Sequence, residues 1–126
     1  MPILSDFTVV NPTTRLLNNS SQSFNFSTGG RHNSDALLDV EVLGGFRGGD
    51  TAMSVRFRLN GDVLTTRTIP RWQDHSLIDY TRNNIRIPPN KLKSSGSNTL
   101  VVEPTYESSA DYMFLGTTVV HFHQVG

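Results

Sequence analysis

Apolar and polar residues alternate with a period of two along most of the chain. This spacing puts successive side chains on opposite faces of a β-sheet, and no segment keeps the helical i, i+3, i+4, i+7 pattern for three turns. The alternation predicts strands at residues 6–10, 22–27, 36–43, 52–59, 62–69, 84–88, 98–103 and 112–123, with a further short segment at 76–79. Short strands between turn residues favour an all-β fold, an antiparallel β-sandwich with jelly-roll topology.

The dipeptide Asn60-Gly61 predicts a two-residue hairpin turn, because both residues tolerate the positive φ angles of a type I′ turn. Such a turn pairs Leu59 with Asp62 and, further along, Phe57 with Leu64. One face of the hairpin then carries Val55, Phe57, Leu59 and Leu64, and the other carries Arg56, Arg58 and Arg67. The sequence therefore predicts one core face and one solvated face.

Length and composition narrow the picture to one domain spanning residues 1–126. The absence of cysteine excludes disulfides, thiolate zinc sites and thiol nucleophiles. Eleven basic residues balance eleven acidic ones, so no global field attracts nucleic acid, and no apolar run is long enough for a membrane span. The first residues lack the basic and apolar regions of a secretory signal, which leaves localisation open between the cytoplasm and a secreted route.

Two segments carry a family resemblance: Ile85–Val102, which reads IRIPPNKLKSSGSNTLVV, and VRFRLNG from Val55. They resemble the strand–turn–strand steps of galactose-binding-like jelly rolls, a group that includes carbohydrate-binding modules and the sugar-binding domains of glycosidases. The resemblance implies a lectin-like β-sandwich that binds carbohydrate. Its parts are physically generic, since Pro88-Pro89 ends a strand, Leu92 plugs the core and Gly96 turns the chain. The chain departs from the family in lacking a recognisable set of calcium ligands and a linked catalytic domain.

Strand direction predicts where a binding site lies. If the chain reverses at Asn60-Gly61, the segments 44–51 and 70–75 meet at the opposite end of the sandwich. These segments contain Phe46 and the six residues of a predicted loop-end site. The six are Arg47, Asp50, Arg71, Trp72, Asp74 and His75. Such a mixture suits a sugar, which presents an apolar C–H face to an aromatic ring and hydroxyls to polar groups.

Each residue of the loop-end site has an expected role. Trp72 is the stacking platform, Asp50 and Asp74 accept hydrogen bonds from hydroxyls, and the side chains of Arg47 and Arg71 donate them. His75 does both, and an outer ring would contain Tyr80, Arg82 and Asn84. The competing interpretation is that Trp72 caps the core beneath its loop.

Other chemistry has less support in the sequence. The arginines on the outer face of the hairpin, Arg56, Arg58 and Arg67, fit either an anion site or a solvated face. His121 and His123 point the same way along one strand, as metal-binding cupins require, but a third ligand could come from His32 or His75 only through a tertiary contact that the sequence does not show. Glycoside hydrolysis would need two carboxyl groups across a cleft, for which Asp50 and Asp74 are the candidates.

The sequence favours a non-catalytic, lectin-like domain whose partner is a carbohydrate, with no cofactor, no metal and no nucleic acid. Because a single sugar site binds weakly, a lectin is expected to be a homo-oligomer that gains avidity by repetition. The alternative is a structural or assembly subunit of jelly-roll type, which acts through protein–protein contacts on its exposed sheet.

Overall fold

The computed structural model describes residues 3–13, 15–17, 21–45, 52–70, 81–105 and 112–125. These residues form nine strands: β1 (Ile3–Asn11), β2 (Arg15–Leu17), β3 (Gln22–Phe26), β4 (Ala36–Gly45), β5 (Ala52–Leu59), β6 (Asp62–Pro70), β7 (Thr81–Ile87), β8 (Asn98–Thr105) and β9 (Tyr112–Val125). No helix in the described part of the chain has the length and hydropathy of a membrane span.

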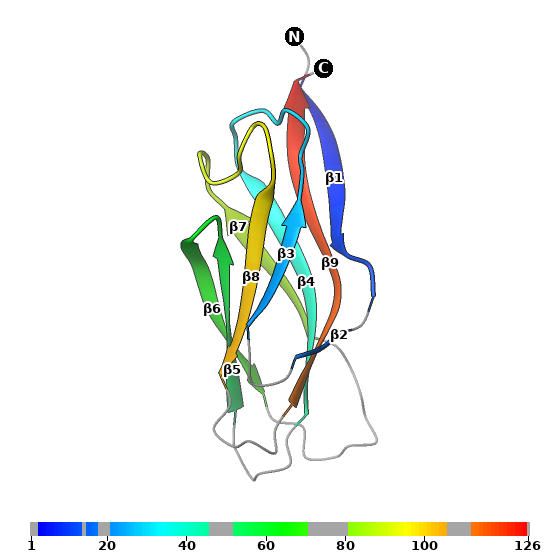
Figure 1. Ribbon diagram of the computed structural model, residues 1–126, viewed down its shortest axis with the longest axis vertical. Coiled ribbons are helices and arrows are strands. Elements are labelled where there is room, and N and C mark those ends of the chain that lie inside the picture. The colour runs from blue at the N-terminus through cyan, green and yellow to red at the C-terminus, as the bar shows by residue number, and fades with distance from the viewer. Residues whose placement is uncertain are drawn as a thin grey trace.

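The strands form two antiparallel sheets that pack face to face (Figure 1). Sheet A has the order β1-β9-β4-β7, with β2 also paired to β9, and sheet B has the order β3-β8-β5-β6. From β2 onward, every connection crosses from one sheet to the other except the β5–β6 hairpin. This alternation is the jelly-roll topology, so the predicted fold class is confirmed.

The predicted strands correspond to observed ones, with differences at their ends. The prediction for 52–59 coincides with β5, whereas β7 begins three residues earlier than predicted, at Thr81. Strand β2 was not predicted, because three residues are too few to show an alternation. The short segment predicted at 76–79 lies outside the described residues.

The β5–β6 turn has the predicted geometry, since Asn60 and Gly61 have φ angles of 51° and 90°. Leu59 pairs with Asp62 as predicted, but a β-bulge at Leu64 then shifts the register by one residue. Phe57 therefore lies opposite Thr65, and Val55 lies opposite Arg67. The predicted pairing beyond the bulge is wrong, because one extra residue exchanges the two faces of the strand.

The Asn60 side chain also fastens this turn to the loop before β8. Its amide nitrogen donates to the Lys91 carbonyl at 2.8 Å and to the Asn98 side-chain oxygen at 2.9 Å. Its oxygen accepts from the backbone N–H of Thr99 at 2.9 Å. Asn98 is completely buried and its oxygen also accepts from the Lys93 N–H. The turn residue predicted for its φ angle is thus also a cross-link between two loops.

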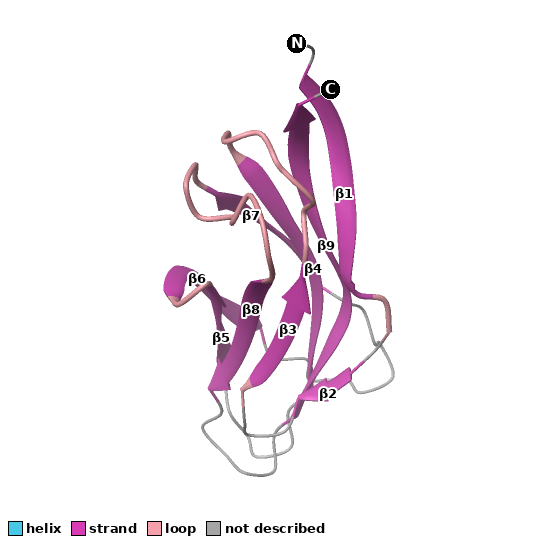
Figure 2. Cartoon of the chain, turned by 45° about the horizontal axis from the view of Figure 1, so that its top comes forward, coloured by secondary structure: helices cyan, strands magenta, loops and turns pink. Residues whose placement is uncertain are grey.

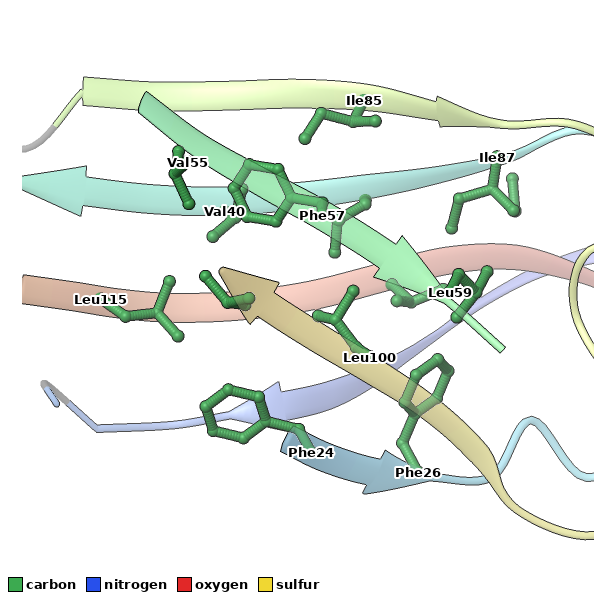
Figure 3. Close-up of a cluster of buried hydrophobic side chains, with 14 of the residues drawn as sticks. Phe24, Phe26, Val40, Val55, Phe57, Leu59, Ile85, Ile87, Leu100 and Leu115 are labelled. Atoms are coloured by element: carbon green, nitrogen blue, oxygen red, sulfur yellow. The ribbon is translucent and has the colours of Figure 1, made fainter. Parts of the chain in front are cut away.

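The core lies between the sheets and is filled by the inward-facing residues of both (Figure 3). Sheet B contributes Phe24, Phe26, Val55, Phe57, Leu59, Leu100 and Val102, and sheet A contributes Ala36, Leu38, Val40, Val42, Ile85, Ile87, Met113, Leu115, Val120 and Phe122. Leu92, from the β7–β8 loop, is 4% exposed and fills the end of this core as predicted.

Removing the ring of Phe57 should destabilise the folded domain. Phe57 is fully buried, so Phe57→Ala is expected to lower the free energy of unfolding by about 3–5 kcal/mol. Chemical denaturation in dilute solution measures this loss. The matched control is Phe7→Ala, which removes the same ring from a site that is 61% exposed and should change stability by less than about 0.5 kcal/mol. Equal effects at the two positions would contradict the described core.

The Asn60 cross-link is tested by Asn60→Gly, which keeps the freedom to adopt positive φ and removes only the side chain. We expect a loss of about 2–3 kcal/mol, because buried partners lose their hydrogen bonds. The control is Asn90→Gly, at another positive φ (71°), where the Asn90 side chain makes one exposed hydrogen bond, to Asn33. A loss at Asn60 no larger than at Asn90, in the same denaturation experiment, would show that the network adds nothing.

Candidate functional site

The six residues of the predicted loop-end site lie outside the described residues, as do Phe46 and Tyr80. The six are Arg47, Asp50, Arg71, Trp72, Asp74 and His75. Of the outer-ring candidates, Arg82 and Asn84 are both described, and both lie on β7. The loop-end site therefore remains a prediction, and the described strands determine only where its two segments are attached.

Those points of attachment all lie at one end of the sandwich. Segment 46–51 joins Gly45 to Ala52, and segment 71–80 joins Pro70 to Thr81. Ala52 pairs with Pro70 at the far end of the hairpin from its turn. In sheet A, the end of β4 pairs with the start of β9, and β7 begins at the same end of the sheet (Figure 1). Both segments thus start and finish at the end opposite Asn60-Gly61.

Arg82 is committed to an ion-pair cluster on the outer face of sheet A. Its guanidinium lies 3.3 Å from Asp39 and 3.1 Å from Glu41, measured between the closest nitrogen and oxygen atoms. His121 faces the same Asp39 carboxylate, with 4.0 Å between Nε2 and Oδ2. Exposed pairs of this kind contribute about 0–1 kcal/mol each, so the cluster shapes the charge of the surface more than its stability.

The two histidines of β9 lie beside a hollow on the surface of sheet A. The hollow has a volume of about 340 Å³ and is lined by Ser5, Asp6, Asp35, Ala36, Leu37, His121, Phe122 and His123. His123 Nδ1 lies 3.2 Å from the Ser34 hydroxyl, and the His121 ring lies 6.4 Å from the ring of Phe7. No group of three metal-ligating side chains occurs among the described residues. The two histidines therefore contact other side chains of the same chain, Ser34 and Phe7, on a largely solvated sheet face.

The three hairpin arginines do not share a face, which corrects the basis of the anion-site interpretation. Arg58 forms an ion pair with Glu103 on the outer face of sheet B, and Arg56 is exposed. Because of the bulge at Leu64, Arg67 points instead toward the neighbouring sheet and donates to the Asn84 carbonyl at 3.4 Å. The three guanidinium groups therefore do not converge on one anion site.

Sequence reasoning did not identify the buried polar residues of the described chain, of which Asn11 is an example. Asn11, at the end of β1, is 1% exposed. Its amide nitrogen donates to the carbonyls of Thr13 and Gly116, at 2.6 and 3.0 Å, and its oxygen accepts from Arg15. Gly116 lies where β9 changes register against β4. Asn11 thus satisfies a carbonyl in an irregular stretch of the longest strand, and no local sequence pattern marks that role.

Neither a scan against protein-family models nor a search of curated proteins finds a match to this sequence. Among solved structures, the chain is similar to dimeric latent PorU from Porphyromonas gingivalis, with a TM-score of 0.79 and 10% identity. That match covers 98% of this chain and 13% of PorU.

A second solved structure, the carbohydrate-binding module CBM36 in complex with calcium and xylotriose, matches with a TM-score of 0.48 and 7% identity. It covers 98% of this chain and 100% of the module, but the superposition is too loose to carry an argument. The likeness to PorU, at its low identity, shows a shared fold and nothing more. The chain is therefore a jelly-roll β-sandwich that spans a small part of the larger protein it resembles.

Proposed function

We propose that this chain is a non-catalytic carbohydrate-binding domain whose sugar site is the loop-end site. The observation that carries the proposal is the common attachment of segments 46–51 and 71–80 at one end of the sandwich. Ala52 and Pro70 are direct partners, and β4 and β7 are neighbours in sheet A. Two short connections that leave from adjacent strands of a rigid scaffold are a typical place for a binding site.

The composition of the two segments supports a sugar as the ligand. They hold the only tryptophan of the chain, together with three aspartates, two arginines and a histidine. An indole ring offers a flat apolar surface to the C–H face of a pyranose, while the polar groups can donate to and accept from its hydroxyls. The two segments carry a net charge of −1 when His75 is neutral, because Arg47 and Arg71 are outnumbered by Asp50, Asp74 and Asp79. This small negative charge disfavours acidic sugars, so a neutral saccharide is the favoured class of ligand.

Binding is favoured over catalysis because the sequence lacks the motifs of a nucleophile or a metal hydrolase. Neither Gly-x-Ser-x-Gly nor His-Glu-x-x-His occurs in it. Asp50 and Asp74 are therefore assigned to hydrogen bonding with hydroxyl groups. Replacing either residue by asparagine should weaken binding, since an amide accepts fewer hydrogen bonds than a carboxylate.

A second candidate function is that of an assembly subunit, and exposed apolar side chains favour it. Among the described residues, the exposed large hydrophobic side chains are Leu4, Phe7, Val9, Leu37 and Val63. Four of the five belong to two strands of sheet A, β1 and β4. Apolar side chains gathered on one sheet commonly mark a surface for another protein. This function would need no sugar.

Trp72→Ala should weaken sugar binding strongly while leaving the domain folded. A glycan array identifies the ligand of the native chain, and calorimetry with the free sugar then measures affinity without avidity. We expect at least a tenfold weakening, about 1.4 kcal/mol or more, from loss of the stacking surface. Trp72→Phe should recover part of it. The control, Phe7→Ala, removes an exposed aromatic ring elsewhere and should bind as the native chain does.

Two outcomes would count against the carbohydrate proposal. Sugar affinity that is unchanged in Trp72→Ala would show that the ring serves the core and not a ligand. A native chain that binds no glycan, and that self-associates equally well with and without the Trp72 ring, would favour the assembly subunit.

A further inference from the structure

Strand β1 is an edge of sheet A that is apolar along much of its length. Its only described sheet partner is β9, and no described residue pairs with its outer side (Figure 2). Three of the five exposed large hydrophobic residues of the described chain lie on it: Leu4 at 53%, Phe7 at 61% and Val9 at 46% exposed. An open edge of this kind is a template for pairing with another chain.

The protective devices that usually blunt such an edge are scarce on β1. Natural edge strands carry lysine, proline or several charges that oppose pairing. Strand β1 contains no lysine, arginine or proline, its one charged residue is Asp6, and its one register shift against β9 lies near its end, between Val9 and Asn11. The opposite edge of the sandwich also has a bulge, at Leu64 of β6, but it differs in that Arg67 reaches across to β7.

The direction of the peptide groups of β9 follows from a contact on its far side. The N–H of His32 donates to the His123 carbonyl at 2.7 Å, and the neighbouring Arg31 bridges Gln124 on that same side. Peptide groups point alternately to the two sides of a strand. The groups of His123 therefore point away from β1, and those of Phe122 and Gln124 point toward it.

The partners of these residues show which peptide groups of β1 are open. Phe122 pairs with Asp6, and Gln124 pairs with Leu4, so these two residues of β1 make the ladder bonds to β9. The alternate residues of β1 direct their N–H and C=O groups outward, away from β9. These residues are Ser5, Phe7 and Val9. In agreement, the Phe7 N–H donates to its neighbour's carboxylate, Asp6 Oδ1, at 2.8 Å.

We propose that β1 pairs antiparallel with β1 of a second copy of this chain, with Phe7 opposite Phe7 at the two-fold axis. The pairing joins the two copies of sheet A into one continuous sheet. It replaces the local bond from the Phe7 N–H to Asp6 by backbone bonds across the axis. The proposal does not depend on sugar binding.

The second copy is the partner that the residues of β1 favour, because the strand is complementary to itself in one register. When both outer faces lie on the same side of the joined sheet, opposite residues must belong to the same face, so the axis passes through a residue. Centring on Phe7 puts Asp6 opposite Thr8 of the second copy, whose hydroxyl can donate to the carboxylate. Centring on Asp6 would place two carboxylates face to face, which is destabilising.

This register also accounts for all three exposed apolar side chains of β1. Phe7 meets Phe7 of the second copy on the outer face, where aromatic cross-strand pairs are favourable. Leu4 lies opposite Val10 of the second copy on the other face. Val9 lies opposite Ser5 and next to the Phe7 pair on the diagonal. A register centred on Thr8 would leave Leu4 beyond the paired region and exposed.

The symmetry has a consequence for the placement of the loop ends. A two-fold axis perpendicular to the sheet reverses the strand direction of the second copy. The ends at which segments 46–51 and 71–80 are attached therefore point in opposite directions. If those ends bind sugar, as proposed above, the dimer can cross-link two glycans. Its two sites cannot face the same flat surface at the same time.

Self-association of the full chain is the first test. Sedimentation equilibrium of the native chain should show a monomer–dimer equilibrium. Phe7→Lys, which puts two ammonium groups face to face, should raise the dimer dissociation constant by at least tenfold. The matched control is Val63→Lys, which adds the same charge at a residue that is 49% exposed on β6 and should dimerise as the native chain does. Mixing Phe7→Lys with Phe7→Glu should restore the dimer.

Cysteine cross-linking tests the register, because the native chain has no cysteine. In Phe7→Cys the two thiols lie opposite each other at a Cα separation of about 5.5 Å, which a disulfide can span. In Val9→Cys they are four positions apart, about 13 Å, and should not cross-link. Val63→Cys is the control for random collisions.

Three results would overturn the proposal: a native chain that is monomeric at millimolar concentration, a dimer that Phe7→Lys leaves intact, or equal cross-linking at positions 7, 9 and 63. The sugar affinity of Phe7→Lys, measured with a free monovalent ligand, keeps the two proposals separate. If Phe7→Lys loses the dimer and keeps its sugar affinity, the β1 interface is supported and the proposal of a sugar site is unaffected.

Discussion

The packing of two apolar sheet faces against each other is the interaction on which the rest of this structure depends. Each sheet alone would expose one row of large side chains, and only the meeting of Phe57, Leu100 and Leu38 with their neighbours removes those rows from water. Because the chain crosses between the sheets at nearly every connection, the loops are gathered at the two ends. The core therefore also determines where a ligand can be bound.

Local irregularities decide which way individual side chains point. The bulge at Leu64 turns Arg67 from the outer face of sheet B toward β7, and so removes it from the other hairpin arginines. In sheet A, the change of register beside Gly116 is stabilised by the buried amide of Asn11. A bulge changes the face of every residue beyond it, so one inserted residue has a large effect on surface chemistry.

The two lateral edges of the sandwich contrast in how they are finished. On one side, β6 and β7 are connected by Arg67 and flank a groove whose rim carries Arg86 and Lys91. On the other side, β1 presents outward-facing peptide groups between apolar side chains. The difference explains why association is assigned to β1. It also separates the two functions in space, since sugar recognition is assigned to one end of the sandwich and association to one edge.

The sequence by itself determined eight of the nine described strands, the Asn60-Gly61 turn and the jelly-roll class, because alternation and positive-φ residues act over a few neighbouring positions. It also predicted that segments 44–51 and 70–75 belong to one end of the sandwich, which needs only strand direction. The tertiary structure alone decided the bulge at Leu64 and the burial of Asn11. Both depend on contacts between residues far apart in the chain, and no local pattern encodes such contacts.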